Sequence, residues 1–312
     1  MKVAAIDCGT NTLRLLVADV DPRSGLLRQL VRRSTIVRLG QDVDRTGVFA
    51  AEALERTFSV LDEYVNLIGD HRVDTAKSGG AVRMVATSAA RDVRNREEFV
   101  AGVRHRLGIE PDVVSGDEEA RLGYVGATRG LDAEMTSPVV VLDIGGGSTE
   151  LVTRADGDIH GQSLDVGSVR LTERHLHDDP PTADQVAAAA ADVEAGLDSL
   201  RLPLGEVGTL VGVAGTTLTM AAMVLGLSSY DRDALHHARV RTPRLVSAVD
   251  TIVAMSVEER QALPFMHRDR ADVIGAGAVV LKQVVQHLGV AEVVASAHDI
   301  LDGIAWSLLD PE

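Results

Sequence analysis

The chain has 312 residues, of which 45% are hydrophobic and 25% charged, so it is expected to be a folded globular protein rather than a disordered or collagen-like chain. Its length favours two domains or one bilobal unit. Aromatic residues make up only 3% and the net charge is −15, which argues against a binder of duplex nucleic acid and against a module that stacks single-stranded bases.

The chain opens with a predicted strand that runs into a turn of small polar residues. Residues 3–6 are all apolar, Asp7 follows them, and a second apolar run begins at Leu13. The turn between the two runs holds three residues with hydroxyl or amide groups: Thr10, Asn11 and Thr12. Such groups can hydrogen-bond phosphate oxygens, although an ordinary turn also explains them.

The first residues also bear on redox state and targeting. Cys8 is the single cysteine, which excludes an intramolecular disulfide, and we expect it to be a small buried side chain. Asp7 interrupts the N-terminal apolar run, so no signal-peptide core is predicted.

An uncharged stretch at 210–230 is interrupted by glycines and threonines, which favours strand, turn and helix over a membrane span. The protein is therefore expected to be cytoplasmic, with no membrane partner.

Helix and strand patterns then alternate. Helical apolar spacing covers 50–68, and residues 81–86 are typical of a strand. Asn95 and Glu98 together predict a capping box that opens a helix ending near residue 107.

Two charged side chains of this region are candidates for a site. Arg91 follows a predicted strand, at the end where α/β proteins bind ligands, although a surface arginine after a helix cap is the alternative. Ser115 and Glu118 form a second capping box, in which the Glu118 carboxylate reaches back to the cap N–H. Glu119 is not part of the capping box and is therefore a candidate general base for water.

The strand–aspartate–turn pattern recurs 136 residues later, at residue 139 against residue 3. An apolar run ends at Asp143, and the turn that leads to Glu150 contains Gly145, Gly146, Gly147 and Ser148. Backbone N–H groups of consecutive glycines can approach an anion closely. Asp143 and Glu150 are hard oxygen ligands suited to Mg²⁺ among phosphates, although an ordinary glycine hairpin with solvated acids is the alternative.

The second half continues the alternation. The predicted elements are a helix from a Thr182 cap to about 200, a strand at 210–213, a helix at 271–287, a strand at 292–296 and a helix at 300–309. Gly215 and Thr216 end the strand at 210–213 and predict another phosphate-binding turn. Close packing of a helix against this strand explains the two small residues equally well. The pairs His236-His237 and His298-Asp299 lack further ligands at metal spacing and are interpreted as loop residues.

Two hairpins of matching chemistry within an alternating chain predict an α/β protein of two similar lobes facing each other across a cleft. Residues 1–125 hold 18 Lys and Arg against 19 Asp and Glu, whereas residues 126–312 hold 13 against 27. A polyanionic ligand is therefore expected to bind to the first half of the chain or through a metal ion. A helix rich in small residues, at 271–280, can pack within its lobe or at a homodimer face, and both stay open.

The paired hairpins resemble the duplicated phosphate loops of the actin-like ATPase superfamily. Within it, the chain is similar to the exopolyphosphatase/guanosine-pentaphosphate phosphohydrolase family. The motifs that carry this resemblance are AIDCGTNT (5–12), TSAARD (87–92), SGDEEARL (115–122), DIGGGSTE (143–150), GSVRLTE (167–173), GT (215–216) and RAD (270–272).

The resemblance implies two ribonuclease-H-like lobes with an active-site cleft between them. The first lobe is expected at 1–125, with a terminal helix at about 298–312 packing back on it, and the second at 126–297. The chain is expected to match the short two-domain members of the family. One departure is the segment Asp-Ile-Leu-Asp-Gly at 299–303, where the family often has Leu-Arg-Glu-Gly.

The resemblance also implies Mg²⁺-dependent hydrolysis of a terminal phosphoanhydride. The catalytic glutamate of the family falls on Glu119, its loop acids on Asp143 and Glu150, which would hold the metal, and its phosphate-contacting arginine on Arg91. The other expected phosphate-binding residues are Thr10, Asn11, Thr12, Gly145, Gly146, Gly147, Ser148, Gly215, Thr216 and Arg270.

The expected substrate is inorganic polyphosphate, hydrolysed from its ends to orthophosphate, and no nucleic-acid partner is expected. The alternative is a guanosine pentaphosphate 5′-phosphohydrolase, for which the sequence shows no clear purine-stacking aromatic. A sugar-kinase-like ATPase is disfavoured because Glu119 lies where these hydrolases place a water-activating acid. A polyphosphate or nucleotide sensor with degraded catalysis is disfavoured because Asp143 and Glu150 are also intact.

Overall fold

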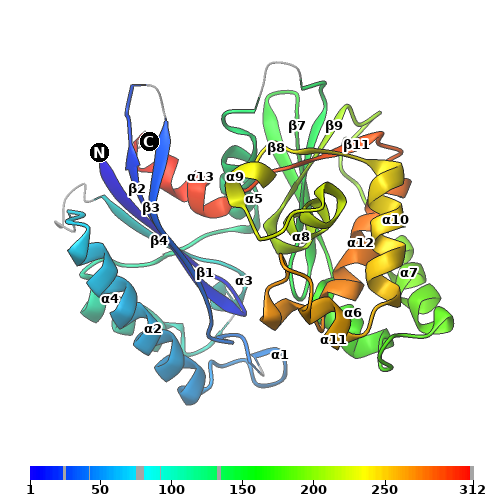
Figure 1. The fold of residues 1–312 in the computed structure, drawn as a ribbon. Helices are drawn as coiled ribbons and strands as arrows, with labels where there is room; N and C mark the ends of the chain where they lie inside the picture. The colour runs from blue at the N-terminus through cyan, green and yellow to red at the C-terminus, as the bar shows by residue number, and fades with distance from the viewer. Residues whose placement is uncertain (24–25, 42, 75–80, 92, 132–134, 310–312) are drawn as a thin grey trace. The chain divides into compact units, whose positions relative to one another are not determined.

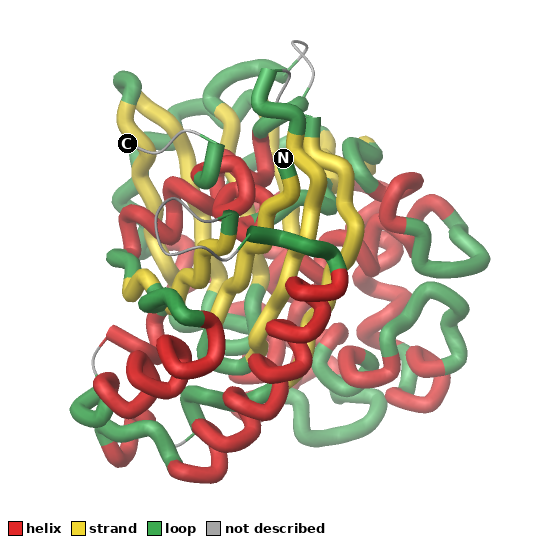
Figure 2. Tube along the Cα trace, turned by 90° about the vertical axis from the view of Figure 1, so that its left-hand side faces the viewer, coloured by secondary structure: helices red, strands yellow, loops and turns green. Residues whose placement is uncertain are grey.

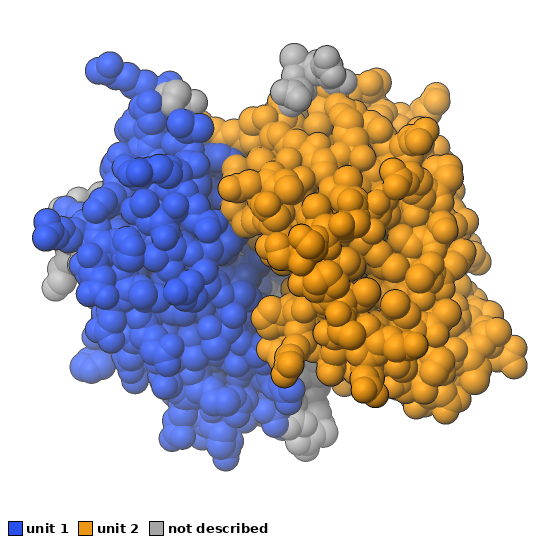
Figure 3. Space-filling model, viewed as in Figure 1, with its two compact units in different colours: residues 1–126, 300–312 blue, residues 127–299 orange. Residues whose placement is uncertain are grey.

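The structure, a computed structural model, describes all residues except 24–25, 42, 75–80, 92, 132–134 and 310–312. The chain forms two compact units, Met1–Gly126 with Ile300–Glu312, and Ala127–Asp299 (Figure 3). Each unit is built around one mixed β-sheet with helices packed on it (Figure 1), so the predicted α/β class is confirmed.

The sheet of the first unit has the strand order β3-β2-β1-β4-β5. Its strands are β1 (Lys2–Cys8), β2 (Thr12–Val20), β3 (Leu27–Ile36), β4 (Val82–Ala86) and β5 (Asp112–Val113). The first three strands are antiparallel, whereas β4 runs parallel to β1 and β5 parallel to β4. Figure 2 views this unit from the left-hand side of Figure 1 and shows the neighbouring strands in yellow.

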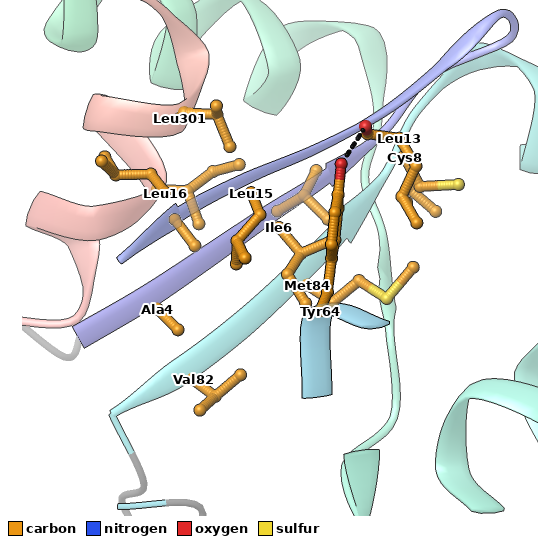
Figure 4. Close-up of a cluster of buried hydrophobic side chains, with 14 of the residues drawn as sticks. Ala4, Ile6, Cys8, Leu13, Leu15, Leu16, Tyr64, Val82, Met84 and Leu301 are labelled. Atoms are coloured by element: carbon orange, nitrogen blue, oxygen red, sulfur yellow. Dashed lines mark hydrogen bonds between the residues drawn. The ribbon is translucent and has the colours of Figure 1, made fainter. Parts of the chain in front are cut away.

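The helices of the first unit are α1 (Val43–Thr46), α2 (Ala51–Asp70), α3 (Ser88–Arg91), α4 (Arg96–Leu107), α5 (Gly116–Thr128, whose end enters the second unit) and α13 (Ile300–Ser307). Residues from α2 and α13 cover opposite faces of the sheet, as Tyr64 and Leu301 show in Figure 4. The Tyr64 hydroxyl donates to the carbonyl of Leu13 at 2.9 Å, which satisfies the one polar atom of that buried ring.

The predicted helix after Asn95 is confirmed, but its predicted cap is wrong. The Asn95 side chain makes no cap hydrogen bond. It instead accepts from the Phe49 N–H at 2.8 Å and donates to the Phe49 carbonyl at 3.1 Å. The asparagine therefore ties the start of α4 to the segment before α2, a long-range use that the local sequence pattern does not reveal.

Helix α13 completes the core of the first unit with the buried side chains of Leu301, Ile304, Ala305 and Trp306. At Gly303, a Cβ atom would lie 2.0 Å from the carbonyl oxygen of Leu122 in α5. Only glycine therefore permits this close approach of the two helices. Asp302 of the same helix is fully buried and forms an ion pair with Arg32 of β3 at 2.5 Å.

The sheet of the second unit has the order β10-β11-β9-β6-β7-β8. Its strands are β6 (Val139–Ile144), β7 (Thr149–Ala155), β8 (Asp158–Leu164), β9 (Thr209–Val213), β10 (Arg239–Arg241) and β11 (Glu292–Ala295). Read from β8 to β11, the strand order and the parallel or antiparallel pairings repeat those of the first sheet. The sequence echo is therefore a repeat of topology, as predicted.

The helical segments of the second unit are α6 (Ser168–His175), α7 (Ala183–Asp198), α8 (Ala214–Leu225), α9 (Arg232–Leu235), α10 (Thr242–Ala254), α11 (Val257–Gln261), a 3₁₀ turn (Arg268–Arg270) and α12 (Ile274–His287). The predicted capping box at Thr182 is confirmed, with both reciprocal bonds to Gln185. The helix predicted to start at 271 starts three residues later, after the 3₁₀ turn. None of the helices in the described part of the chain is long and apolar enough to cross a membrane.

Candidate active site

Three loops of the first unit meet at the carboxyl edge of its parallel strands. Strand β1 leads into the turn at 9–11, β4 into α3, and β5 into α5. Backbone hydrogen bonds join these exits: the Thr87 N–H donates to Cys8 at 3.1 Å, and the Val114 N–H donates to Ala86 at 3.1 Å. Ligands of α/β proteins bind at this edge, so these loops form the candidate site of the first unit.

The turn after β1 is held by the chain around it. The Gly9 N–H donates to the Thr12 carbonyl at 3.0 Å and closes the turn. The carbonyls of Thr10 and Asn11 accept hydrogen bonds from segment 37–40 at 2.8 and 2.9 Å. Both residues are exposed. The backbone of the turn is therefore fixed and both of these residues are accessible, which suits a phosphate-binding turn.

Arg91 and Glu119, which the sequence singled out separately, lie together. The Arg91 guanidinium donates through Nε to the Val114 carbonyl at 3.0 Å, and its Nη2 forms an ion pair with Oε2 of Glu119. The side chains are 29% and 32% exposed, so the pair is accessible from one side. Glu119 is thus not the isolated carboxylate that the sequence suggested, because a fixed arginine stands next to it.

Glu118 makes only half of the predicted capping box. Its N–H donates to Oγ of Ser115 at 3.2 Å, but its carboxylate binds Arg121 at 2.7 Å and Arg83 at 3.5 Å. The hydrogen bonds from Arg121 hold the pKa of Glu118 below its usual range. Glu118 therefore anchors the first turn of α5, which leaves Glu119 as the candidate carboxylate for chemistry.

The glycine loop of the second unit lies between β6 and β7. The Gly145 N–H donates to the Ser148 carbonyl at 2.9 Å, as Gly9 does to Thr12 in the first unit. The carbonyls of Gly145 and Gly146 accept hydrogen bonds from the N–H groups of residues 168–170, the first turn of α6, at 2.8–3.1 Å. At Gly167, a Cβ atom would lie 2.6 Å from both the Gly146 oxygen and the Ser148 nitrogen. The loop is therefore packed tightly against α6.

This packing fixes the direction of the loop N–H groups. In a planar trans peptide the C=O and the following N–H point in opposite directions. Because the carbonyls of Gly145 and Gly146 point toward α6, the N–H groups of Gly146 and Gly147 point away from it. The Gly145 N–H is already used within the loop, where it donates to Ser148. The N–H groups of Gly146 and Gly147 are therefore the two that the loop offers most directly to a phosphate.

The two acids of this loop face each other across β6 and β7. Asp143 is the direct register partner of Glu150. At the equivalent place in the first unit, Asp7 is paired with Arg14, and the two form an ion pair at 2.5 Å. Like charges directly opposite each other in a sheet are unfavourable. The second unit therefore sets two carboxylates opposite each other where the first sets a carboxylate opposite a guanidinium, and this pair is the candidate place for a cation.

A cation at this pair would need further ligands. The Ser163 hydroxyl donates to Oε1 of Glu150 at 2.8 Å and so orients that carboxylate. Among the described residues, no group of three or more His, Cys, Asp or Glu side chains is arranged to hold a metal ion. Mg²⁺ is commonly held by one or two carboxylates together with water and substrate phosphates, and the pair Asp143 and Glu150 fits that donor set.

Arg270 lies against the start of α8. Gly215 and Thr216 are in the first turn of this helix rather than at the end of β9, which corrects the sequence prediction. A Cβ atom at Gly215 would lie 2.0 Å from Cζ of Arg270, so the guanidinium occupies the space that glycine leaves. Burial lowers the pKa of Arg270. Thr216 is buried, and a Cβ at Gly277 would lie 2.7 Å from its hydroxyl, so Thr216 packs against α12.

Three histidines of the second unit form a cluster that the sequence did not reveal. The rings of His236 and His237 are 3.7 Å apart, and those of His236 and His298 are 4.2 Å apart. Burial, together with the neighbouring rings, lowers the pKa of His236 to about 3. The Ala297 N–H donates to Nδ1 of His236 at 3.2 Å. The fold joins residues about sixty positions apart, so no local spacing signals the cluster.

Two sheets of the same topology, each with a glycine-containing turn after its first strand, define the actin-like two-unit class. The chain belongs to the Ppx/GppA phosphatase family, whose model matches residues 16–312. The chain is 44% identical to Exopolyphosphatase 2 of Mycobacterium tuberculosis over 98% of both chains. Both the fold and the family expected from the sequence are confirmed.

Solved structures agree with this assignment. The crystal structure of the Aquifex aeolicus Ppx/GppA family member matches with a TM-score of 0.84 and 31% identity, covering 98% of this chain and 97% of that one. An exopolyphosphatase from Cytophaga hutchinsonii matches with a TM-score of 0.83 and 24% identity, covering 99% and 98%, and supports the fold.

Proposed function

We propose that this chain is an exopolyphosphatase, which releases orthophosphate from the ends of inorganic polyphosphate. The observation that carries the proposal is the pair formed by Arg91 and Glu119 at the carboxyl edge of the first sheet. It sets a group that can bind a terminal phosphate beside a group that can accept a proton from water. Membership of the phosphatase family and the 44% identity to Exopolyphosphatase 2 support it.

In the proposed reaction, a water oxygen attacks the terminal phosphorus while Glu119 accepts a proton from that water. The bond from phosphorus to the bridging oxygen breaks, which yields orthophosphate and a chain one phosphate shorter. Phosphoryl transfer depends mainly on positioning and on charge stabilisation. The other groups proposed to bind phosphate are Thr10, Asn11, Thr12, the N–H groups of Gly146 and Gly147, Ser148, and Arg270, whose guanidinium lies against Gly215.

The expected lobes, 1–125 with 298–312 and 126–297, would correspond to the two compact units.

Asp143 and Glu150 are assigned to hold Mg²⁺, because they place two carboxylates opposite each other. When bound, the ion supplies positive charge to the phosphoryl oxygens. Ser163 orients the Glu150 carboxylate through its hydroxyl, at 2.8 Å. A cation held by the two acids would offset the negative charge that a polyanion meets in this strongly acidic half of the chain.

Guanosine pentaphosphate is the second candidate substrate. Tyr230 is 45% exposed, so it offers an aromatic surface on which a purine could stack, which the sequence alone did not identify. Equal or faster turnover of guanosine pentaphosphate than of polyphosphate would favour this candidate.

The proposed function predicts phosphate release from polyphosphate that requires a divalent cation. Purified protein with Mg²⁺ is expected to release orthophosphate from polyphosphate faster than from guanosine pentaphosphate or ATP, and a chelator should abolish release. Asp143→Asn is expected to raise the Mg²⁺ concentration needed for half-maximal release at least tenfold, since it removes one of the two carboxylates. Phosphate release measured by a colorimetric assay checks both results. Tight binding of all three ligands without any release would instead identify a sensor.

Gly215→Ala is expected to raise KM for polyphosphate without lowering the melting temperature. A Cβ at residue 215 would displace the Arg270 guanidinium, whereas alanine is the better helix former by about 0.5–1 kcal/mol. Steady-state kinetics and thermal melts of Gly215→Ala, Arg270→Gln and the double variant check this. If Gly215→Ala weakens substrate binding only by displacing Arg270, the double variant should have the same KM as Arg270→Gln alone. Fully additive losses would contradict the assignment.

A further inference from the structure

Arg170 lies beside the glycine loop but has no role in the chemistry above. It is the third residue of α6 and part of the motif at 167–173. Its backbone N–H donates to the Gly146 carbonyl at 3.1 Å. Its Nη2 lies 3.5 Å from the place where a Cβ would stand at Gly147. Both the backbone and the guanidinium of this residue therefore contact the loop.

The charge of Arg170 is only weakly engaged. Its Nη1 lies 3.4 Å from Oδ1 of Asp165, whose side chain is 87% exposed, while the Arg170 side chain is 36% exposed. One turn along the same helix, Arg174 pairs with Asp192 at the shorter distance of 2.9 Å. A long ion pair with a largely solvated carboxylate is easily exchanged for a stronger anion.

The alternative anion at this loop is a phosphate. Guanidinium groups bind phosphate oxygens through two parallel N–H donors, which is a better match than the single long contact with Asp165. The loop also lies next to Asp143 and Glu150, whose carboxylates repel a polyanion wherever a bound cation does not fully neutralise them. An arginine at the loop offsets part of that repulsion.

We propose that Arg170 is a further substrate-binding residue, whose guanidinium exchanges Asp165 for a phosphate group of polyphosphate at the glycine loop. This inference rests on the proposed function. Arg170 contacts the bound polyphosphate and not the reacting atoms, so replacing it weakens substrate binding more than it lowers turnover. Asp165 competes with the substrate for the same guanidinium.

The test uses three single variants and one double variant, compared with the wild type in KM and kcat for polyphosphate. Arg170→Gln is expected to raise KM about tenfold to a hundredfold, because at least one charge-assisted hydrogen bond to the substrate is lost. Its kcat should change less than about threefold. Asp165→Asn is expected to lower KM, and the double variant should behave like Arg170→Gln. Arg174→Gln, the matched control on the same helix, should behave like the wild type.

Two results would overturn the inference. One is an unchanged KM in Arg170→Gln, and the other is an Asp165→Asn effect that persists when Arg170 is absent. A purely structural role of Arg170 would lower the melting temperature and kcat without a selective rise in KM. If the wild type does not hydrolyse polyphosphate, the proposed function fails, but calorimetric titration with tripolyphosphate still tests Arg170. Equal affinity of wild type and Arg170→Gln for tripolyphosphate then rejects the inference on its own.

Discussion

Replacing Glu119 with glutamine is expected to lower the rate of phosphate release about 10²–10⁴-fold, the usual loss when a general base is removed. Glutamine has nearly the same shape and can still accept a hydrogen bond from Arg91, so the first turn of α5 should remain in place. The loss should therefore appear in kcat, with little change in KM or in the melting temperature. Steady-state phosphate release and thermal unfolding of the same preparation check this.

Glu118→Gln is the matched control for this variant. It removes the neighbouring carboxylate, which pairs with Arg121 and Arg83 rather than facing the candidate site. We expect it to lower stability slightly and to keep kcat within a few-fold of the wild type. Near-full turnover by folded Glu119→Gln protein would show that another group activates the water.

Arg32→Gln is expected to be the most destabilising of the substitutions considered, by about 3–5 kcal/mol, the usual cost of leaving one buried charge without its partner. Asp302 is fully buried, and the Arg32 side chain that pairs with it is only 16% exposed. Removing the guanidinium leaves this carboxylate in the core of the first unit, without its counter-ion. Urea unfolding at neutral pH, followed by circular dichroism, measures the change in the free energy of unfolding.

A double variant separates the ion pair from other effects of Arg32. Arg32→Met with Asp302→Leu removes both buried charges together and is expected to recover most of the lost stability, because neither desolvation penalty remains. Arg28→Gln, on the same strand as Arg32, breaks an exposed pair with Asp19 of the neighbouring strand β2 and should leave the unfolding midpoint unchanged. A double variant as unstable as Arg32→Gln would show that the ion pair is not the cause.

Much of the fold could be predicted because its signals are local. The apolar runs of β1 and β6 and the helical spacing of α2 each follow from a periodicity within one element, and the repeat of Asp7 and Asp143 revealed two related sheets. The boundaries were less predictable. The 3₁₀ turn before α12 and the early start of α8, where Ala214 has a φ of 58°, depend on packing against other elements.

The candidate site divides in the same way. The sequence identified Arg91 and Glu119, each from its place at a strand end or helix start, but not that they form a pair, because β4 and β5 become neighbours only in the folded sheet. The sequence also did not distinguish the three glycines of the loop from one another. The use of the Gly145 N–H within the loop depends on the backbone path between β6 and β7, which residue types alone do not specify.

The return of α13 to the first sheet has a consequence for how the protein is made. During synthesis β1, β2 and β4 leave the ribosome early, but the residues that cover one of their faces, Leu301 to Trp306, are made only after the whole of the second unit. The second unit is continuous in sequence and can fold as soon as it is complete, whereas the first must wait with an apolar face uncovered. The usual vectorial order, in which the N-terminal domain folds first, is thus reversed in this chain. Chaperone binding to nascent chains should persist until α13 emerges.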